Sequence, residues 1–266
     1  SERIRNLPTR NINALAATSA GLASSDEGRA ITVRGSRTTN TDYYIDGIRV
    51  RGNLVPETEI EQLQVITGGM EAQYGDVTGG IISITTKGPA SAFTGGAEVE
   101  SSKYLDNFRH TLAGVNLSGP ILKNKQGRAI LGYRFSGRYT DQLDGNPSSV
   151  PLFQVKPEKL LELEANPIIS SQGSFLVNAD YLKQDDVNSL STRPNERYKR
   201  IDVTGKLDAR LNKAIDLSFS GSYVDEQDQF TPGGWRLLNS ENNPLNNTNT
   251  YRGVFRFRHR LGGAAN

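Results

Sequence analysis

The chain of 266 residues contains no cysteine, only two histidines and no long apolar run. Without cysteine it can form neither disulfide bonds nor thiolate metal sites. Its apolar runs are only a few residues long, whereas a membrane-spanning helix needs roughly 20. Helices and closed barrels are the two structures that satisfy their backbone in lipid, so any membrane crossing by this chain must use a β-barrel.

The charged residues give no sign of a large charged partner. Lys and Arg number 31, Asp and Glu 29, and the net charge is +2. Since the two signs are interspersed, the chain lacks the electrostatic footprint of a nucleic-acid-binding protein. We therefore expect no nucleic-acid partner.

Little in the sequence points to catalysis or a bound metal. His110 and His259 fall in predicted strands with no metal-ligand spacing, and neither lies in a loop with the glycines of a nucleophile elbow. Sequence order alone leaves a Ser-His-Asp arrangement open. The acidic cluster Asp225, Glu226 and Asp228 suggests either calcium binding or, as we favour, a solvated loop. We expect no enzyme, no metal site and no cofactor.

What the chain does contain is strict alternation of apolar and polar residues. Tyr251 to Leu261 places Tyr, Phe, Phe and Leu on one face and four arginines on the other. The same period of two recurs in Ala129 to Tyr139, Ile201 to Leu211 and Ile215 to Tyr223, and it is typical of strands with unlike faces. In a soluble sheet the apolar face would meet a core; in a transmembrane barrel it would meet lipid, with the charges in the lumen. A hydrophobic content of 35% with 27 glycines and 10 tyrosines is consistent with the barrel.

The first 89 residues predict a separate small α+β domain that ends near Pro89. Asp46-Gly47 between two β-prone runs is the strongest hairpin signal in this part. The expected elements are a helix at Asn11 to Ala17, strands at Ala30 to Gly35, Tyr43 to Val50 (the hairpin), Leu63 to Ile66 and Ile81 to Lys87, a helix at Pro56 to Gln62, and a loop at Glu71 to Gly80.

Four segments of this domain together resemble the plug domain of the TonB-dependent outer-membrane receptors. They are Ile31 to Gly35, Tyr44 to Ile48, Ile60 to Gly69 and Tyr74 to Lys87. The motif residues are Arg34, Gly35, Asp46, Gly47, Glu61, Tyr74, Gly75, Gly79 and Gly80. The run Asn116 to Ile121 followed by Lys123 to Lys125 is similar, more weakly, to the Oar-like branch of Bacteroidetes receptors.

This resemblance implies a plug inside an outer-membrane barrel of about 22 strands, ligand bound by loops and plug, and import driven by a TonB-type energy-transducing complex. It also implies that Arg34 and Glu61 help to lock plug to barrel through ion pairs, although plain solvated charge is an alternative. No signal peptide, coupling box or aromatic terminal strand is visible, so we interpret the chain as a fragment: the plug (1–89) and about six barrel strands (90–266).

Two further functional classes stay open at this point. The barrel could be a scaffold or binding component of a surface assembly, with a surface lipoprotein or a secretion apparatus as partner and no active import. The chain could also be a soluble antiparallel β protein whose aromatic faces pack on one another. An energy-coupling box upstream of Ser1 would favour the receptor.

The topology of the second part follows from the rule that successive strands of an antiparallel barrel cross the membrane in alternate directions. Thr94 to Ser102 runs outward, His110 to Ser118 returns, and Arg128 to Thr140 runs outward again. Because periplasmic turns are short and extracellular loops long, the tight Asn212 to Ala214 connection is periplasmic, as is Gly119 to Gly127. Asp141 to Arg200 (141–200) is then one extracellular loop, and Phe175 to Tyr181 should not span.

We expect the long loop to contain helices at Lys156 to Ala165 and Asp180 to Leu190, with Asn178 as a possible cap of the second. A second outer loop covers Asp225 to Asn249. Loops on a rigid scaffold tend to hold binding residues, and the candidates for ligand or partner contact are Trp235, Phe230 and Arg236. Trp235 is equally well explained as an interfacial residue.

The arginines of the strands are the remaining candidates. Arg134, Arg138, Arg252, Arg256 and Arg258 are predicted to face the lumen. They could form an anion path, but lumen charges often pair with one another or with a plug, and we favour that interpretation. The glycines between Tyr74 and Gly80 lack the ending of a phosphate-binding loop and indicate a turn. The sequence does not identify the ligand.

Overall fold

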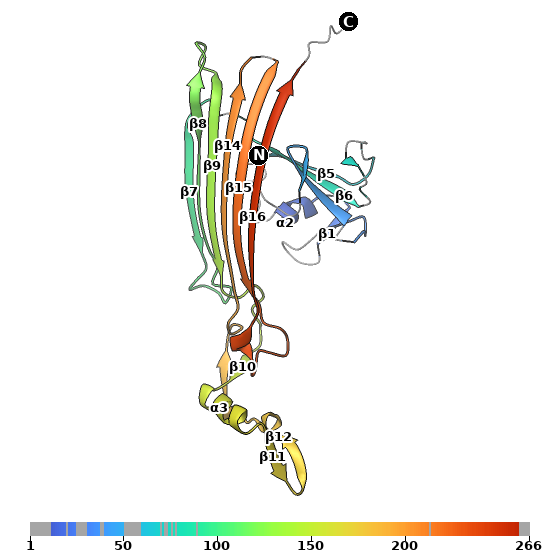
Figure 1. The fold of residues 1–266 in the computed structure, drawn as a ribbon, viewed down its shortest axis with the longest axis vertical. Helices are drawn as coiled ribbons and strands as arrows, with labels where there is room; N and C mark the ends of the chain where they lie inside the picture. The colour runs from blue at the N-terminus through green and yellow to red at the C-terminus, as the bar shows by residue number, and fades with distance from the viewer. Residues whose placement is uncertain are drawn as a thin grey trace.

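The computed structural model describes two β-rich parts that lie side by side (Figure 1). The described residues up to Gly88 form the smaller part, and those from Ala90 onward form the larger. The described residues are 12–19, 21–24, 31–37, 40–50, 60–69, 71, 74–75, 77, 79–88, 90–212 and 214–260. Pro89 lies outside them, so the predicted domain boundary at that residue stays a prediction.

The smaller part is built on a four-stranded sheet with the order β4-β3-β6-β5. Strands β3 and β6 are parallel, and the other pairs are antiparallel. A short helix and a two-stranded sheet, β1-β2, complete this part. The elements are α2 (Ile12–Ala17), β1 (Leu22–Ser24), β2 (Ile31–Val33), β3 (Thr41–Ile45), β4 (Ile48–Val50), β5 (Ile60–Ile66) and β6 (Gly80–Thr86).

Isoleucines from several strands form the core of this part. The cluster is Ala16, Ile31, Ile45, Ile60, Ile82 and Ile84, each at most 2% exposed. Branched side chains at Cβ favour the extended backbone and pack well on a pleated surface. The core therefore holds α2, β2, β3, β5 and β6 together.

The predicted hairpin at Asp46-Gly47 is confirmed. β3 and β4 pair from Tyr43–Val50 to Ile45–Ile48. Asp46 and Gly47 have φ angles of 52° and 82°, and positive φ at both central residues is the requirement of the type I′ turn that matches strand twist.

One predicted helix of this part is wrong at its described end. Ile60 to Gln62 belong to β5, which pairs with β6, because Ile60 gains more from the buried core than from a helical turn. Residues 56–59, the remainder of that predicted helix, and Ala30, the start of the predicted Ala30 to Gly35 strand, lie outside the described residues.

The larger part is a six-stranded antiparallel sheet with the order β16-β15-β14-β9-β8-β7. The six predicted strands are thus confirmed. Their bounds are β7 (Thr94–Ser101), β8 (Thr111–Lys123), β9 (Ala129–Gln142), β14 (Arg197–Arg210), β15 (Ile215–Gln229) and β16 (Leu245–His259).

This sheet has one apolar and one charged face. The apolar side chains are exposed: Tyr251 is 76%, Phe255 68% and Phe257 60% accessible. Across the strands Leu207 pairs with Phe219, and Phe219 with Phe255, so the aromatic and aliphatic residues form rows. The smaller part lies against the opposite, charged face through bonds from Arg134 and Lys206 (Figure 1).

The predicted turn from Gly119 to Gly127 is too long. β8 continues to Lys123, with register shifts on either side of Leu122. Pro120 lacks an N–H, and a bulge accommodates such a residue within a sheet. The turn occupies the residues after Lys123, where Asn124 Oδ1 accepts bonds from the N–H groups of Gln126 and Arg128 at 3.0 and 2.8 Å.

The long connection between β9 and β14 forms its own substructure, which projects beyond one end of the sheet (Figure 1). It contains β10 (Leu152–Val155), α3 (Pro157–Ala165), β11 (Ile168–Ser171), β12 (Ser174–Val177), η4 (Asn178–Tyr181), η5 (Gln184–Asp186) and β13 (Val187–Leu190). The predicted helix at Lys156 to Ala165 is confirmed. β12 pairs with β11 rather than with the main sheet, so the expectation that Phe175 to Tyr181 does not span is also confirmed.

The second predicted helix of this connection, Asp180 to Leu190, is wrong. Two single 3-10 turns are followed by β13, which pairs with β10. Asn178 does not cap a helix there, since its Nδ2 donates to Asn166 O at 3.0 Å. Pairing with a distant strand thus overrides the local helical tendency.

Both outer connections are shorter than predicted. β9 extends to Gln142 and β14 begins at Arg197, which leaves residues 143–196; β15 extends to Gln229 and β16 begins at Leu245, which leaves 230–244 with η6 (Ser240–Asn242). The ladders continue past the apolar rows because backbone hydrogen bonding does not require apolar side chains. None of the helices in the described part of the chain is long and apolar enough to span a membrane.

The two faces predict opposite responses to charge. In a lipid bilayer, Phe255→Lys should lower the free energy of unfolding by about 2–4 kcal/mol if the residue lies near mid-bilayer, because Phe255 is 68% exposed on the apolar face. Arg256→Lys, at the next residue, keeps the charge on the other face and should leave the free energy of unfolding nearly unchanged. Urea unfolding in lipid vesicles measures both variants. A Phe255→Lys variant as stable as Arg256→Lys would mean that Phe255 does not face lipid.

Candidate functional site at the interface of the two parts

The end of β6 is bonded to the charged face of the large sheet. Lys206 Nζ in β14 donates to Thr86 Oγ1 at 2.8 Å and to Lys87 O at 3.1 Å. Arg134 in β9 donates through Nε and Nη2 to Gly88 O at 2.9 and 2.8 Å. Lys206 and Arg134 are direct neighbours in the β9–β14 ladder, so the two cations hold consecutive residues of one segment.

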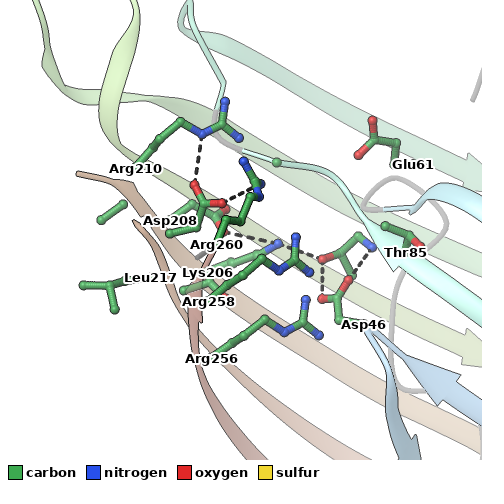
Figure 2. Close-up of a pocket in the computed structure, with 15 residues that line it drawn as sticks. Asp46, Glu61, Thr85, Lys206, Asp208, Arg210, Leu217, Arg256, Arg258 and Arg260 are labelled. Atoms are coloured by element: carbon green, nitrogen blue, oxygen red, sulfur yellow. Dashed lines mark hydrogen bonds and ion pairs between the residues drawn. The ribbon is translucent and has the colours of Figure 1, made fainter. Parts of the chain in front are cut away.

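Thr86 connects this attachment to the β3–β4 turn. Its N–H and Oγ1–H donate to Asp46 Oδ1 and Oδ2 at 2.9 and 2.6 Å. On the sheet side, Lys206 Nζ lies 3.4 Å from Asp208 Oδ1, and both side chains are only 11% exposed. A continuous polar chain therefore runs from Asp46 through Thr86 and Lys206 to Asp208 (Figure 2).

A pocket of about 180 Å³ surrounds this chain and is lined by five cations and four carboxylates, a net charge of +1; we call it the cationic pocket. The charged residues are Lys206, Arg210, Arg256, Arg258, Arg260, Asp46, Glu61, Asp208 and Asp216. Arg210 Nε and Arg260 Nη2 both approach Asp216, at 3.1 and 2.8 Å. Figure 2 shows Arg256 and Arg258 extending from β16 toward Asp46. Among the described residues, neither of these two arginines has an ion-pair partner.

Of the two residues that the resemblance assigns to locking, only Glu61 reaches this pocket, where it is an exposed part of the lining. Arg34 lies within the smaller part, its guanidinium so close to Gly68 that a Cβ there would come within 3.1 Å of Nη1. Its N–H donates to Gly21 O at 2.7 Å. The locking ion pairs of Arg34 and Glu61 stay a prediction.

Other motif residues shape the smaller part itself. The ring of Tyr74 packs edge-on against Tyr44 at 5.0 Å, and Tyr44 Oη donates to Tyr74 O at 2.8 Å. A Cβ on Gly79 would overlap the backbone of Asn40, which only glycine avoids. Tyr43 Oη donates to Asn13 Oδ1 at 2.7 Å, and burial raises the pKa of this phenol above its ordinary value.

The predicted strand arginines divide into two groups. Arg134 is bonded to Gly88, and Arg138 Nη2 lies 4.0 Å from Glu98 Oε1, which agrees with the interpretation that lumen charges pair with one another or with the plug. Arg256 and Arg258 line the cationic pocket, and Arg252 lies within electrostatic range of Asp46. Sequence reasoning missed Lys206 and Thr86, although the alternation placed Lys206 on the charged face.

The loop candidates lie at the other end of the sheet. Phe230, Trp235 and Arg236 follow the end of β15, and the first two are 40% and 38% exposed. The structure does not bring them to the pocket, which is formed at the opposite end by Arg210 and Asp216. Near these loops Glu226 accepts from Arg200 Nη1 at 2.9 Å, and no cluster suited to a metal ion occurs among the described residues.

Residues 1–81 match the family model of the TonB-dependent Receptor Plug Domain. The smaller part of the chain is therefore a TonB-dependent receptor plug domain. A probable TonB-dependent siderophore receptor, PirA of Acinetobacter baumannii, is 28% identical over 173 residues, which are 56% of this chain and 22% of that protein. The ferric enterobactin receptor PirA of Pseudomonas aeruginosa is 32% identical over 153 residues, 48% of this chain and 20% of that protein. The chain thus spans about a fifth of these curated relatives.

Solved structures of outer-membrane receptors have a fold similar to that of this chain. The alcaligin outer-membrane receptor FauA of Bordetella pertussis has a TM-score of 0.60 at 14% identity, over 98% of this chain and 35% of that one. A mutant of the ferric enterobactin receptor PfeA of P. aeruginosa has a TM-score of 0.59 at 18% identity, over 99% and 38%. In fold, the smaller part corresponds to the plug and the larger sheet to a section of the barrel of these receptors. The family comprises receptors and transporters rather than enzymes. The Oar-like affiliation stays a prediction.

The attachment of the plug predicts the effect of removing its bonds. Lys206→Met removes two hydrogen bonds from a charged donor, each worth about 1.5–3 kcal/mol, and should speed amide hydrogen exchange at Thr86. Thr86→Val should do the same, whereas Thr86→Ser, which keeps the hydroxyl, should not.

Exposed Lys123, at the same end of the sheet, provides the matched control Lys123→Met. Hydrogen exchange read by mass spectrometry on the receptor in detergent measures all four variants. Equal protection of β6 in Lys206→Met and Lys123→Met would contradict the attachment.

Proposed function

We propose that the full-length protein is an energised outer-membrane receptor that imports a ferric siderophore. The observation that carries the proposal is the attachment of a family plug to the charged face of the barrel section by Lys206 and Arg134. A plug held in that position occludes the lumen. Import then requires that the plug, or part of it, be displaced.

The polar character of the interface supports such a displacement. A hydrogen bond from a charged donor contributes about 1.5–3 kcal/mol net once its exchange for bonds to water is counted, so bonds such as Arg134 to Gly88 can be replaced one at a time by water. An apolar core would oppose sliding, because its separation exposes apolar surface to water. Force from the periplasm can therefore shift the balance between plug conformers.

The names of the relatives suggest the ligand class. Two are described as siderophore or ferric enterobactin receptors and a third as an alcaligin receptor. We assign the first contact with ligand to the outer loops, with Phe230, Trp235 and Arg236 as candidates, because aromatic and arginine side chains are typical binding anchors. The ordered substructure at 143–196 would cover the same entrance.

Partners follow from the same proposal. A TonB-type energy-transducing complex would act on the N-terminal side of the plug, and outer-membrane lipid would contact the apolar face that contains Phe219 and Phe255. A surface lipoprotein or another outer-membrane protein is a further candidate partner for the outer substructure.

Uptake of radioactive iron separates a receptor from a scaffold. Cells that depend on this protein for iron should accumulate a ferric siderophore, and deletion of the energy-transducing protein should reduce accumulation to background while surface binding persists. Phe230→Ala with Trp235→Ala should weaken surface binding. Surface binding without energy-dependent accumulation in the parent strain would favour the scaffold.

A further inference from the structure

We infer that Arg256 and Arg258 form a subsite for an anionic, oxygen-bearing group, which faces the plug carboxylate of Asp46 at rest and is occupied by a ferric chelate as the chelate leaves. The inference rests on the proposed import function for the identity of the natural ligand. The subsite itself rests on the geometry of the cationic pocket.

The cations of this pocket differ in whether they have hydrogen-bond or ion-pair partners. Lys206 is held by Thr86 and Asp208, whereas Arg210 and Arg260 share Asp216. Arg256 and Arg258 point instead toward Asp46 (Figure 2), and the described residues provide no ion pair for either. Arg256 is half-buried and Arg258 is exposed. Because the two positive charges lie two positions apart on the same face of one strand and repel each other, they favour an anion in front of them.

Asp46 is suited to be an exchangeable occupant. Two of its acceptor positions are used by the N–H and hydroxyl of Thr86, and an ionised carboxylate has about four. The remaining positions can face the arginines. Asp46 belongs to the β3–β4 turn of the plug and the arginines to the barrel, so displacement of the plug removes the carboxylate and leaves the subsite open.

The subsite lies where an imported ligand would leave. Arg256 and Arg258 are near the C-terminal end of β16, on the side of the sheet with the short β8–β9 and β14–β15 turns and opposite the long outer loops. In this family's topology that side is periplasmic. A ferric chelate of three catecholates is anionic, whereas one of three hydroxamates is neutral, and only the former offers the arginines a net negative charge.

Competition between the two anions would couple the ligand to the plug. A ligand that binds only when Asp46 has left favours the displaced plug by its own binding free energy. The pocket thus predicts that anionic ligands ease plug displacement and that neutral ligands do not.

Inorganic phosphate tests the subsite without any need for transport. Purified full-length receptor is titrated with phosphate at constant ionic strength, which removes general screening, and binding is read as an increase in melting temperature. Asp46→Asn removes the competing charge, and asparagine tolerates the positive φ of this turn. Because the competing carboxylate is then replaced by a neutral amide, Asp46→Asn should bind phosphate about tenfold more tightly than the parent, a difference of about 1.4 kcal/mol.

Replacement of the arginines supplies the decisive comparison. Arg256→Gln with Arg258→Gln, added to Asp46→Asn, should abolish the phosphate-dependent shift, and Arg256→Lys with Arg258→Lys should retain much of it. Arg138→Gln, a barrel arginine beside Glu98, is the matched control and should change nothing. Phosphate binding that is absent in Asp46→Asn, or unaltered by the glutamine pair, would overturn the subsite.

Uptake then tests the role of the subsite in transport. The double variant Arg256→Gln with Arg258→Gln, the glutamine pair, should slow energy-dependent accumulation of a ferric tricatecholate without weakening surface binding of this chelate. The double variant Arg256→Lys with Arg258→Lys, the lysine pair, should restore the rate of accumulation. Unchanged accumulation in the glutamine pair would overturn the exit role. Slowed accumulation that the lysine pair does not restore, together with new sensitivity to a large antibiotic, would indicate a loosened plug and also overturn it. Absence of uptake in the parent would contradict the proposed function, while phosphate binding would still decide the subsite.

Discussion

Aromatic and aliphatic side chains on one face of a six-stranded sheet, and arginine, lysine and aspartate on the other, determine what each face can contact. The exposed row with Leu207, Phe219 and Phe255 requires an apolar environment, which lipid provides. The charged face requires polar partners, and a plug whose strand β6 ends in a hydroxyl and two carbonyls provides them. The same constraint thus accounts for membrane contact, for the position of the plug and for an interface that can be taken apart.

The elements that the sequence predicted well are those in which one local rule decides the structure. Alternation located four of the six strands, and Asp46-Gly47 specified a turn whose two positive φ angles few other residue pairs adopt. Proline at the first turn and a run of helix formers located α3. The direction of successive strands, combined with loop length, excluded Phe175 to Tyr181 from the barrel. If the tight connection at Asn212 to Ala214 is periplasmic, the strand before it runs inward, and the whole segment between that strand and the preceding outward strand lies outside.

The predictions that failed concern segments decided by distant partners. Ile60 to Gln62 have helical character but pair with β6, and Val187–Leu190 pair with β10. Strand ends were predicted too early because residues such as Asp225 to Gln229 are polar, yet the ladder with β16 continues through them. The candidate site was recognised only in part for a similar reason. Alternation placed Lys206 and Arg256 on the charged face, but their relation to Thr86 and Asp46 depends on where the plug sits, which no local pattern encodes.

The central claim, that the two faces of the sheet meet lipid and a polar interior, is tested most directly by spin labels on β16. The chain has no cysteine, so single cysteines at consecutive positions from Tyr251 to Arg258 can be labelled in receptor reconstituted in vesicles. The account predicts that collision with oxygen, which concentrates in lipid, is high at Tyr251, Phe255 and Phe257 and low at Arg252, Arg256 and Arg258. Equal accessibility at alternate positions, or the opposite phase, would contradict it.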